Sequence, residues 1–250
     1  MTLLARLLSP FSGSHIVANG FAAGLKLVAR RADPSFAQGT YEPSIQDAIV
    51  SNLDVGNVFF DIGANIGFFS LIAGRRVGED GRVYAFEPVA WNAAAIKRSA
   101  ELNRLSMIEV FPEAVGSHSY RGELLLAHHI GGATLSSAGA PPDFSNRVPI
   151  DVVALDDIIG RRGLRPPALV KIDVEGAEID VLRGMPETLR VSRPTIIYEV
   201  DDETREGIDR KGRVMAEFLT AAGYMLEPLP PAYPEQGWQI VHVLSRPALA

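Results

Sequence analysis

The sequence predicts an α/β fold: a Rossmann-like, seven-stranded, mostly parallel sheet with an antiparallel hairpin at its edge and helices on both faces. Three observations support this fold class. Val58-Phe59-Phe60 is a wholly apolar run, typical of a strand buried on both faces of a parallel sheet. Two glycines and a helical pattern follow it. Similar alternations of strand and helix recur until two consecutive strand patterns close the chain.

The elements can be placed in chain order. Residues 1–50 show no strand-like alternation and predict an N-terminal helical extension or cap, with its second helix capped by Ser44. Residues 51–250 are expected to form a single domain. Its later strands are expected at 82–86, 107–111, 168–173, 195–199, 224–229 and 239–244, and its helices near 91–103, 155–159, 178–183 and 214–222.

The regular pattern fades between residues 117 and 149. Residues 123–127 and 148–153 predict an added hairpin, and the loop 131–142 between them is rich in small residues and proline. A loop this long inside a compact domain is usually functional or disordered. We expect the segment 117–149 to form a mobile lid over a substrate site.

Composition narrows the function classes. The chain has 250 residues, a net charge of −6 and no cysteine. The charge argues against a nucleic-acid partner, and the lack of cysteine excludes disulfides and thiolate sites. No apolar run reaches the ~20 residues of a membrane span. The basic, apolar start of the chain fits a signal peptide poorly because Ser9, Pro10 and Ser12 interrupt it, so we expect a cytoplasmic protein.

The turn after the first sheet strand indicates a ligand. Gly63 allows a sharp turn, and Gly67 allows close packing of helix on strand. Asp61 precedes them, and a carboxylate at this position would repel a pyrophosphate but attract a sulfonium or an ammonium. S-adenosylmethionine carries both cations and no phosphate. The G-x-x-x-G spacing also disfavours NAD, which prefers G-x-G-x-x-G.

A second carboxylate supports a nucleoside-type ligand. Glu87 ends the second predicted strand, about two dozen residues after Gly63, where doubly wound folds place the acid that binds ribose hydroxyls. Pro88 stops the strand. The predicted ligand site is therefore the mouth formed by the ends of these two strands.

Several segments stand in a particular order and spacing: Phe60–Gly67 with Ser70, Tyr84–Pro88, Glu113–Gly116, Lys171–Glu178 and Val181–Gly184. Together they resemble the FkbM family of S-adenosylmethionine-dependent methyltransferases, which have the class I methyltransferase fold. The resemblance covers roughly residues 39–225.

The resemblance implies methyl transfer to a hydroxyl oxygen of a sugar or natural product, and hence a small-molecule acceptor. It also implies a set of cofactor contacts. These are Tyr41 and Glu42 in the lead-in, Asp61, Gly63, Ala64, Asn65, Gly67 and Ser70 around the turn, Glu87 and Pro88 at the ribose, Glu113 and Ala114 at the adenine, and Asp173 at the reacting end.

Acids near the ends of the fourth and fifth strands are the candidate catalytic residues. Asp173, Glu175 and Glu199 can each take the acceptor proton or orient the acceptor. A Mg²⁺ ion held by these acids and Glu178 is an open alternative, although their spacing is not diagnostic. None of the histidines lies in a convincing motif, and His242 in an edge strand is expected to pack.

Two other functions stay open on the sequence alone. A nicotinamide dehydrogenase would use a related sheet, and the glycine spacing and Asp61 disfavour it. A binding module that keeps the cofactor pocket without catalysis would share every residue of the turn.

Overall fold

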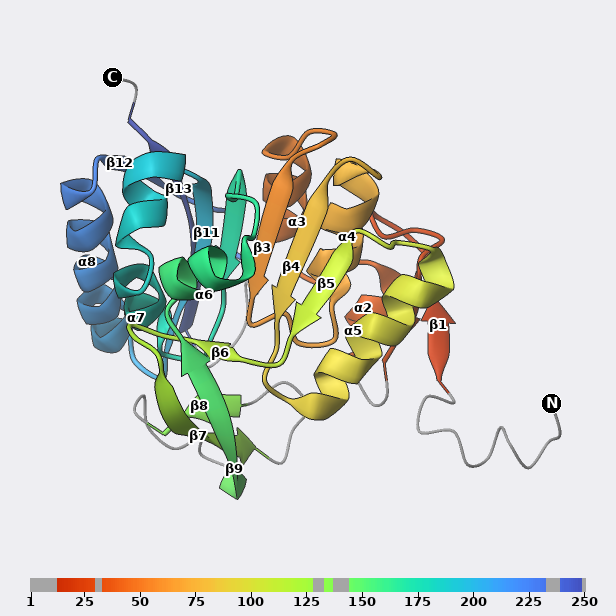
Figure 1. The fold of residues 1–250 in the computed structure, drawn as a ribbon, viewed down its shortest axis with the longest axis horizontal. Helices are drawn as coiled ribbons and strands as arrows, with labels where there is room; N and C mark the ends of the chain where they lie inside the picture. Colours follow the sequence, from red (N-terminus) through yellow and green to blue (C-terminus); the bar gives the residue numbers. More distant parts are fainter. Residues whose placement is uncertain (1–12, 30–32, 128–132, 137–143, 233–238, 249–250) are drawn as a thin grey trace, which may run out of the picture.

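The described part of the chain is built around a seven-stranded sheet. The computed structural model describes residues 13–29, 33–127, 133–136, 144–232 and 239–248. The strand order is β12-β13-β11-β10-β3-β4-β5 (Figure 1). These strands are β3 (Val58–Ile62), β4 (Arg82–Phe86), β5 (Ile108–Phe111), β10 (Leu169–Ile172), β11 (Thr195–Asp202), β12 (Tyr224–Pro228) and β13 (Gln239–Pro247).

The sheet is parallel except at one edge. β3, β4, β5, β10 and β11 pair in parallel, whereas β13 runs antiparallel to both β11 and β12. The chain proceeds from β3 outward to β5 and then returns to β10 on the other side of β3. Ligands of open α/β sheets bind at such a reversal, beyond the carboxyl ends of the strands. The predicted sheet and its edge hairpin are confirmed.

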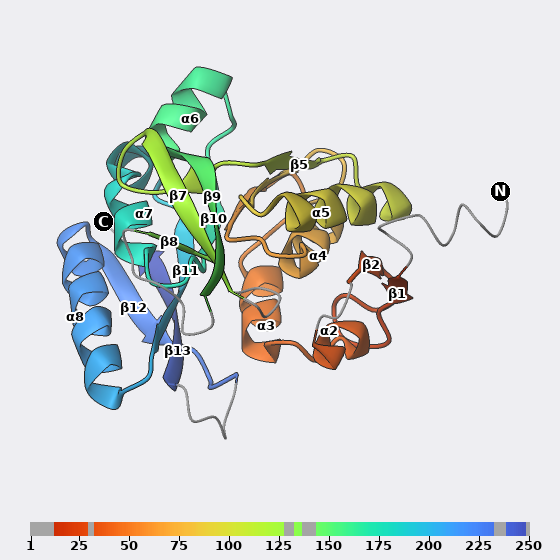
Figure 2. The ribbon, with the colours of Figure 1, turned by 90° about the horizontal axis from the view of Figure 1, so that it is seen from below.

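Helices cover both faces of the sheet (Figure 2). Alternation along β3 sends Phe59 into the core under α3 and α4, and Phe60 into the core under α6, α7 and α8. The helices are α2 (Pro34–Gln38), α3 (Pro43–Ser51), α4 (Phe68–Val77), α5 (Ala90–Asn103), α6 (Leu155–Arg162), α7 (Glu178–Arg183), the π-helix η1 (Thr188–Ser192) and α8 (Arg205–Ala221). None of the described helices is both long enough and apolar enough to cross a bilayer.

The N-terminal extension expected to be helical contains the helices α2 and α3, but its described part also contains strands, which the sequence did not predict. β1 (Ser14–Ile16) and β2 (Lys26–Val28) form an antiparallel hairpin before α2 and α3. The hairpin is held by α5, because Ser99 Oγ accepts from the Val28 amide at 2.9 Å and Asn103 Oδ1 from the Lys26 amide at 2.8 Å. These partners lie more than 70 residues away, so local sequence carries no sign of them. Residues 1–12 lie outside the described residues.

A second, smaller sheet lies beyond the arrow tips of β3, β4 and β5 (Figure 1). Its order is β6-β9-β7-β8, formed by β6 (Ala114–Val115), β7 (Tyr120–Ala127), β8 (Ala133–Leu135) and β9 (Phe144–Val153). The predicted hairpin is thus present as the antiparallel pair β7 and β9. Of the loop expected to be a lid, residues 131–132 and 137–142 lie outside the described residues.

The turn after β3 depends on a residue without a side chain. Gly63 has φ +79°, and a Cβ there would lie 1.7 Å from the carbonyl oxygen of Asp173. We therefore expect Gly63→Ala to lower the free energy of unfolding by at least ~2 kcal/mol, since both backbone strain and a backbone clash oppose it. Urea unfolding measures this change.

Gly160 provides a matched control for that substitution. It lies inside α6 and has nothing within 4 Å of the Cβ position. Gly160→Ala should leave stability unchanged or raise it by up to ~1 kcal/mol, because alanine favours helix. Equal effects of the two substitutions would show that the turn does not require glycine.

Candidate functional site

The glycine turn joins the ends of β3 and β4. The amides of Gly63 and Ala64 donate to the Phe86 carbonyl at 3.0 and 3.1 Å. Asn65 and Gly67 both have positive φ, +50° and +83°. A Cβ at Gly67 would lie 2.8 Å from Ile96 on α5, so glycine permits the close approach of the two helices.

Glu87 connects this turn to the loop after β4 through hydrogen bonds. Its Oε2 accepts from the Asn65 amide at 2.7 Å and its Oε1 from the Val89 amide at 2.9 Å. The residue is only 5% exposed, and this burial raises its pKa to about 7. The structure therefore brings together the two sequence-predicted halves of the ligand mouth. Pro88 follows, half-buried.

A row of polar side chains crosses the inner face of the sheet under α3 and α4. In the strand register Asp61 on β3 lies beside Lys171 on β10, and Glu199 on β11 lies beside His242 on β13. Asp173 follows β10 on the same face, because side chains alternate along a strand. We call these five residues the polar row.

Asp61 occupies the buried end of the polar row. It is 0% exposed, and Ser70 on α4 donates to its Oδ2 at 2.5 Å. Burial raises the pKa of Asp61, although the Lys171 ammonium opposes that shift. The carboxylate expected to face a cationic ligand is thus enclosed and already lies near a cation of the protein.

Lys171 is a central residue that the sequence interpretation did not single out. Its Nζ lies 2.8 Å from Asp173 Oδ2 and 5.2 Å from the centre of the Phe69 ring. Burial alone would lower the pKa of Lys171, but Asp173, Asp61 and Glu42 together hold it above its ordinary value. Its ammonium is therefore charged and partly balances the surrounding carboxylates.

Two candidate acids border the site beyond β10. Asp173 is ion-paired with Lys171, and its side chain is 24% exposed. Glu175 is exposed, with φ +55°; partial desolvation and the nearby carboxylates of Asp173 and Glu199 raise its pKa to about 9. Both can face a ligand at the carboxyl end of the sheet.

Glu178 instead has a structural role. Its Oε1 accepts from the amides of Val174 and Gly176 at 3.2 and 3.0 Å, which closes the loop into α7. Burial raises its pKa to about 7.

Glu199 and His242 form a close pair at the far end of the polar row. His242 Nε2 lies 2.7 Å from Glu199 Oε2 and 3.9 Å from Glu42 Oε2. His242 is 5% exposed, and burial lowers its pKa although Glu42 opposes that shift. The expectation that His242 only packs missed this pair, because it depends on the register of β11 against β13.

Tyr41 and Glu42, which directly precede α3, lie on the side of the sheet that α3 and α4 cover. Glu42 is the αL residue preceding α3, with φ +42°, and is buried against the polar row. The Tyr41 ring stacks on Phe36 with centroids 3.9 Å apart and also contacts Phe69. Their predicted contacts with the cofactor stay predictions.

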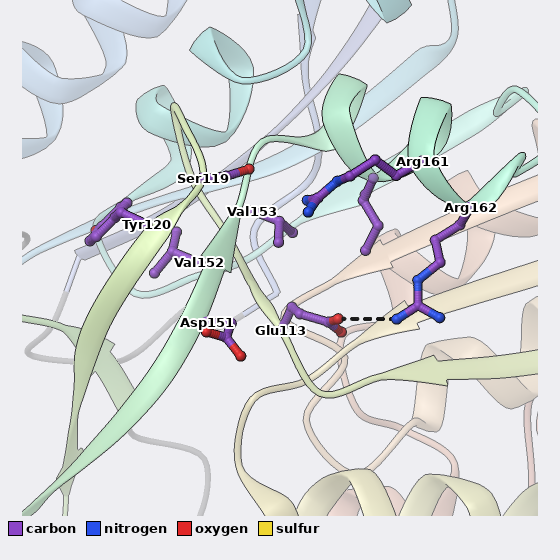
Figure 3. A pocket seen from close by; sticks show the side chains of 9 residues that line it. Glu113, Ser119, Tyr120, Asp151, Val152, Val153, Arg161 and Arg162 are labelled. Carbon is purple, nitrogen blue, oxygen red and sulfur yellow. Dashed lines mark ion pairs between the residues drawn. The ribbon is translucent and has the colours of Figure 1, made fainter.

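The two residues expected at the adenine lie at the base of the smaller sheet. Ala114 is buried in a cluster with Ala177 and Val174. Glu113 Oε1 lies 3.7 Å from Arg162 on α6, and this ion pair lines a cavity of about 330 Å³ (Figure 3). The structure therefore gives Glu113 a protein partner, and its adenine contact stays a prediction.

The expected magnesium ligands do not converge. Among the described residues, the carboxylate and imidazole atoms that lie within 4.8 Å of one another belong to Glu42, Glu199 and His242. Of the acids considered for magnesium from the sequence, only Glu199 belongs to this group. The magnesium ion therefore gains no support from the structure.

Comparison with known proteins decides the family. The model of the methyltransferase FkbM domain matches residues 61–226, which include the glycine turn, Glu87 and most of the polar row. The chain belongs to the FkbM methyltransferase family.

Two relatives show how far this similarity extends. The 31-O-demethyl-FK506 methyltransferase FkbM of Streptomyces tacrolimicus is 32% identical over 174 residues, which cover 59% of this chain and 66% of that protein. The hexuronic acid methyltransferase AglP of Haloferax volcanii is 26% identical over 171 residues, covering 68% of this chain and 65% of that protein. The chain thus matches just under two thirds of the length of each.

A solved structure supports the fold of this FkbM family member. The methyltransferase FkbM of Methylobacillus flagellatus KT has a TM-score of 0.50 and 20% sequence identity, over 75% of this chain and 43% of that one. At this identity the likeness concerns the fold alone.

The raised pKa of Glu87 predicts a pH-dependent stability. Its pKa is about 7 in the fold and near 4.5 when unfolded, so the folded chain binds the proton more tightly. The free energy of unfolding should therefore fall as the pH rises from 4.5 to 7, with Glu87 contributing ~3 kcal/mol of that fall. Glu87→Gln should remove this contribution, measured by urea unfolding at pH 5 and pH 8.

Glu101→Gln is the control, because Glu101 is an exposed acid on α5. It should keep the wild-type slope. A Glu87→Gln chain that also keeps that slope would show that Glu87 is ionised at little cost.

Proposed function

We propose that this chain transfers a methyl group from S-adenosylmethionine to a hydroxyl oxygen of a sugar or a natural-product-type small molecule. The observation that carries the proposal is the hydrogen bond from the Asn65 amide to Glu87 Oε2 at 2.7 Å. This bond joins the glycine turn to Glu87, the acid expected to bind the ribose, and so supports one ligand mouth at the ends of β3 and β4. S-adenosylmethionine supplies a methyl group on a sulfonium, which is an electrophile without phosphate.

The residues at the mouth fit such a ligand. Glu87 accepts the amides of Asn65 and Val89 and a side-chain hydrogen bond from Asn92, which leaves one acceptor position of the carboxylate for a ribose hydroxyl. Asp61 Oδ1 and Asn65 Oδ1 are buried with no hydrogen-bond partner among the described residues. Gly63 and Gly67 allow close packing against Asp173 and Ile96, which shapes the turn at the mouth, and Ala64, Pro88, Ala114 and Glu113 are the further residues proposed to contact the cofactor.

The charge of the site also suits a cation. Asp61, Asp173, Glu42 and Glu199 lie around one ammonium, that of Lys171. Buried carboxylates in excess of their counter-charges favour a positively charged guest. The methyl donor carries such a charge at its sulfonium.

Methyl transfer then requires positioning and removal of one proton. Holding the acceptor oxygen in line with the methyl group can supply ~7–11 kcal/mol of the barrier. Asp173 and Glu175 follow the carboxyl end of β10, and Glu199 lies within the neighbouring strand β11; these three acids are the candidates to orient the acceptor or take its proton. We also propose that the segment 117–149, whose described part belongs to the smaller sheet, covers the acceptor.

The acceptor class rests on the names of the relatives. One is named for a demethylated FK506 and the other for a hexuronic acid. We therefore propose an oxygen acceptor on a polyketide-like or glycosyl molecule. Extracts incubated with the chain and methyl-labelled S-adenosylmethionine, analysed by mass spectrometry, would identify it.

Calorimetry tests the donor. Wild-type chain should bind S-adenosylmethionine and show no binding of NAD. Glu87→Gln should weaken binding of S-adenosylmethionine at least tenfold, since the ribose would lose a charged acceptor. The exposed control Glu101→Gln should bind as wild type. Tight binding of NAD without binding of S-adenosylmethionine would contradict the proposal.

A further inference from the structure

Two strands at the acceptor side of the sheet present an imidazole and a carboxylate to each other. Glu199 and His242 are direct partners in the register of β11 and β13. Their Nε2 and Oε2 atoms are 2.7 Å apart, a hydrogen-bond distance, and the side chains are 14% and 5% exposed. A pair this close and this enclosed has a fixed geometry.

We propose that Glu199 is the base that takes the proton of the acceptor hydroxyl, and that His242 is the positioning residue that holds Glu199 for this step. The inference rests on the proposed methyl transfer and goes beyond it by selecting one of three candidate acids. It also assigns a role to a histidine that the family resemblance did not indicate.

Location favours Glu199 over the other two acids. Asp173 already pairs with the Lys171 ammonium at 2.8 Å, so that side chain is held by a partner of the protein. Glu175 is exposed on a loop, where nothing described fixes its orientation. Glu199 lies within β11, level with Asp173 just past the carboxyl end of β10, and ligands of this fold class bind beyond such strand ends.

The surroundings also strengthen Glu199 as a base. Burial, together with Asp173 and Glu42, holds the pKa of Glu199 well above its usual range, with Lys171 opposing. Asp201 on the same strand adds to the shift. A carboxylate with a raised pKa accepts a hydroxyl proton more readily at neutral pH.

The proposed step balances. The hydroxyl proton moves to Glu199, and a lone pair on the acceptor oxygen forms the new bond to the methyl carbon. The bond between methyl carbon and sulfur breaks with its electron pair on sulfur, which leaves a neutral thioether. Neutral His242 donates its Nε2 proton to Glu199 Oε2, so the other oxygen of Glu199 is the one that takes the proton.

A divalent metal is the competing occupant of this cluster. Glu42, Glu199 and His242 offer three ligand atoms within 4.8 Å of one another. The 2.7 Å separation of Nε2 and Oε2 fits a shared proton better, and Lys171 already supplies positive charge nearby. Treatment with a chelator distinguishes a bound metal from a proton shared by the pair.

The test compares pH–rate profiles of methyl transfer to the acceptor found with labelled S-adenosylmethionine. Glu199→Gln should lower kcat at least 100-fold, with the affinity for S-adenosylmethionine within threefold of wild type. His242→Phe removes the hydrogen bond to ionised Glu199, so the acid limb of kcat should move up by about one pH unit. His242→Gln keeps an N–H donor and should restore the limb. His15→Gln, at an exposed position on β1, is the control.

Several results would overturn the proposal. Wild-type kcat in Glu199→Gln, or an unmoved acid limb in His242→Phe, would remove the pair from catalysis. Activity lost to a chelator and restored by Mn²⁺ would assign the cluster to a metal instead.

Failure of the proposed function is recognised separately, because the wild type itself would then bind no S-adenosylmethionine or yield no product. The ¹⁵N NMR signals of His242 give a readout that needs no acceptor. They should show a neutral imidazole protonated at Nε2 at pH 7 and should shift in Glu199→Gln; titration as a free imidazole would contradict the pair.

Discussion

The ion pair between Lys171 and the carboxylates around it is the interaction on which the site depends. Lys171 projects from a central strand into the face covered by α3 and α4, where Asp61 and Asp173 are its neighbours. Buried carboxylates are costly unless they are paired, because burial disfavours their charged form. The ammonium makes it possible for acids to lie at the strand ends that form the ligand mouth.

That arrangement links the two halves of the proposed chemistry. On one side, hydrogen bonds join the glycine turn, β4 and Glu87 at the mouth that we propose for the adenosyl group. On the other, Asp173 and the pair of Glu199 and His242 line the region beside the next strands. A cationic methyl donor between them would be attracted by carboxylates that Lys171 balances only in part. The acidity of the site thus bears on both proposed roles, binding of the donor and proton transfer.

Much of the fold can be predicted from the sequence, because its signals are local. An apolar run such as Val58–Phe60, followed by glycines and a helical period, marks strand, turn and helix within a dozen residues. The hairpin of β1 and β2 could not be predicted in this way, since Ser99 and Asn103 of α5 hold it. Tertiary contacts, and not the local sequence, therefore determine that this segment forms a hairpin.

The candidate site likewise contains residues that local motifs predict and residues that depend on tertiary contacts. Glu87 and Gly63 occupy positions that a short motif fixes, and the structure brings them together as expected. Lys171 and His242 escaped the sequence interpretation, because their partners come from neighbouring strands through register. Asp61 shows the limit most clearly: its position was predicted, but its enclosure beside a lysine was not.

The most direct test of this account is the stability of Lys171→Met at two pH values, with the exposed Lys97→Met as control. Removing one partner of a buried ion pair should cost ~3–5 kcal/mol of unfolding free energy at pH 8. The wild-type lysine stays charged at both pH values. The loss of unfolding free energy should therefore be smaller at pH 5, because the carboxylates that have lost their cation, Asp61 among them, take up protons there. A Lys171→Met chain as stable as wild type at pH 8 would contradict the central role of the ammonium.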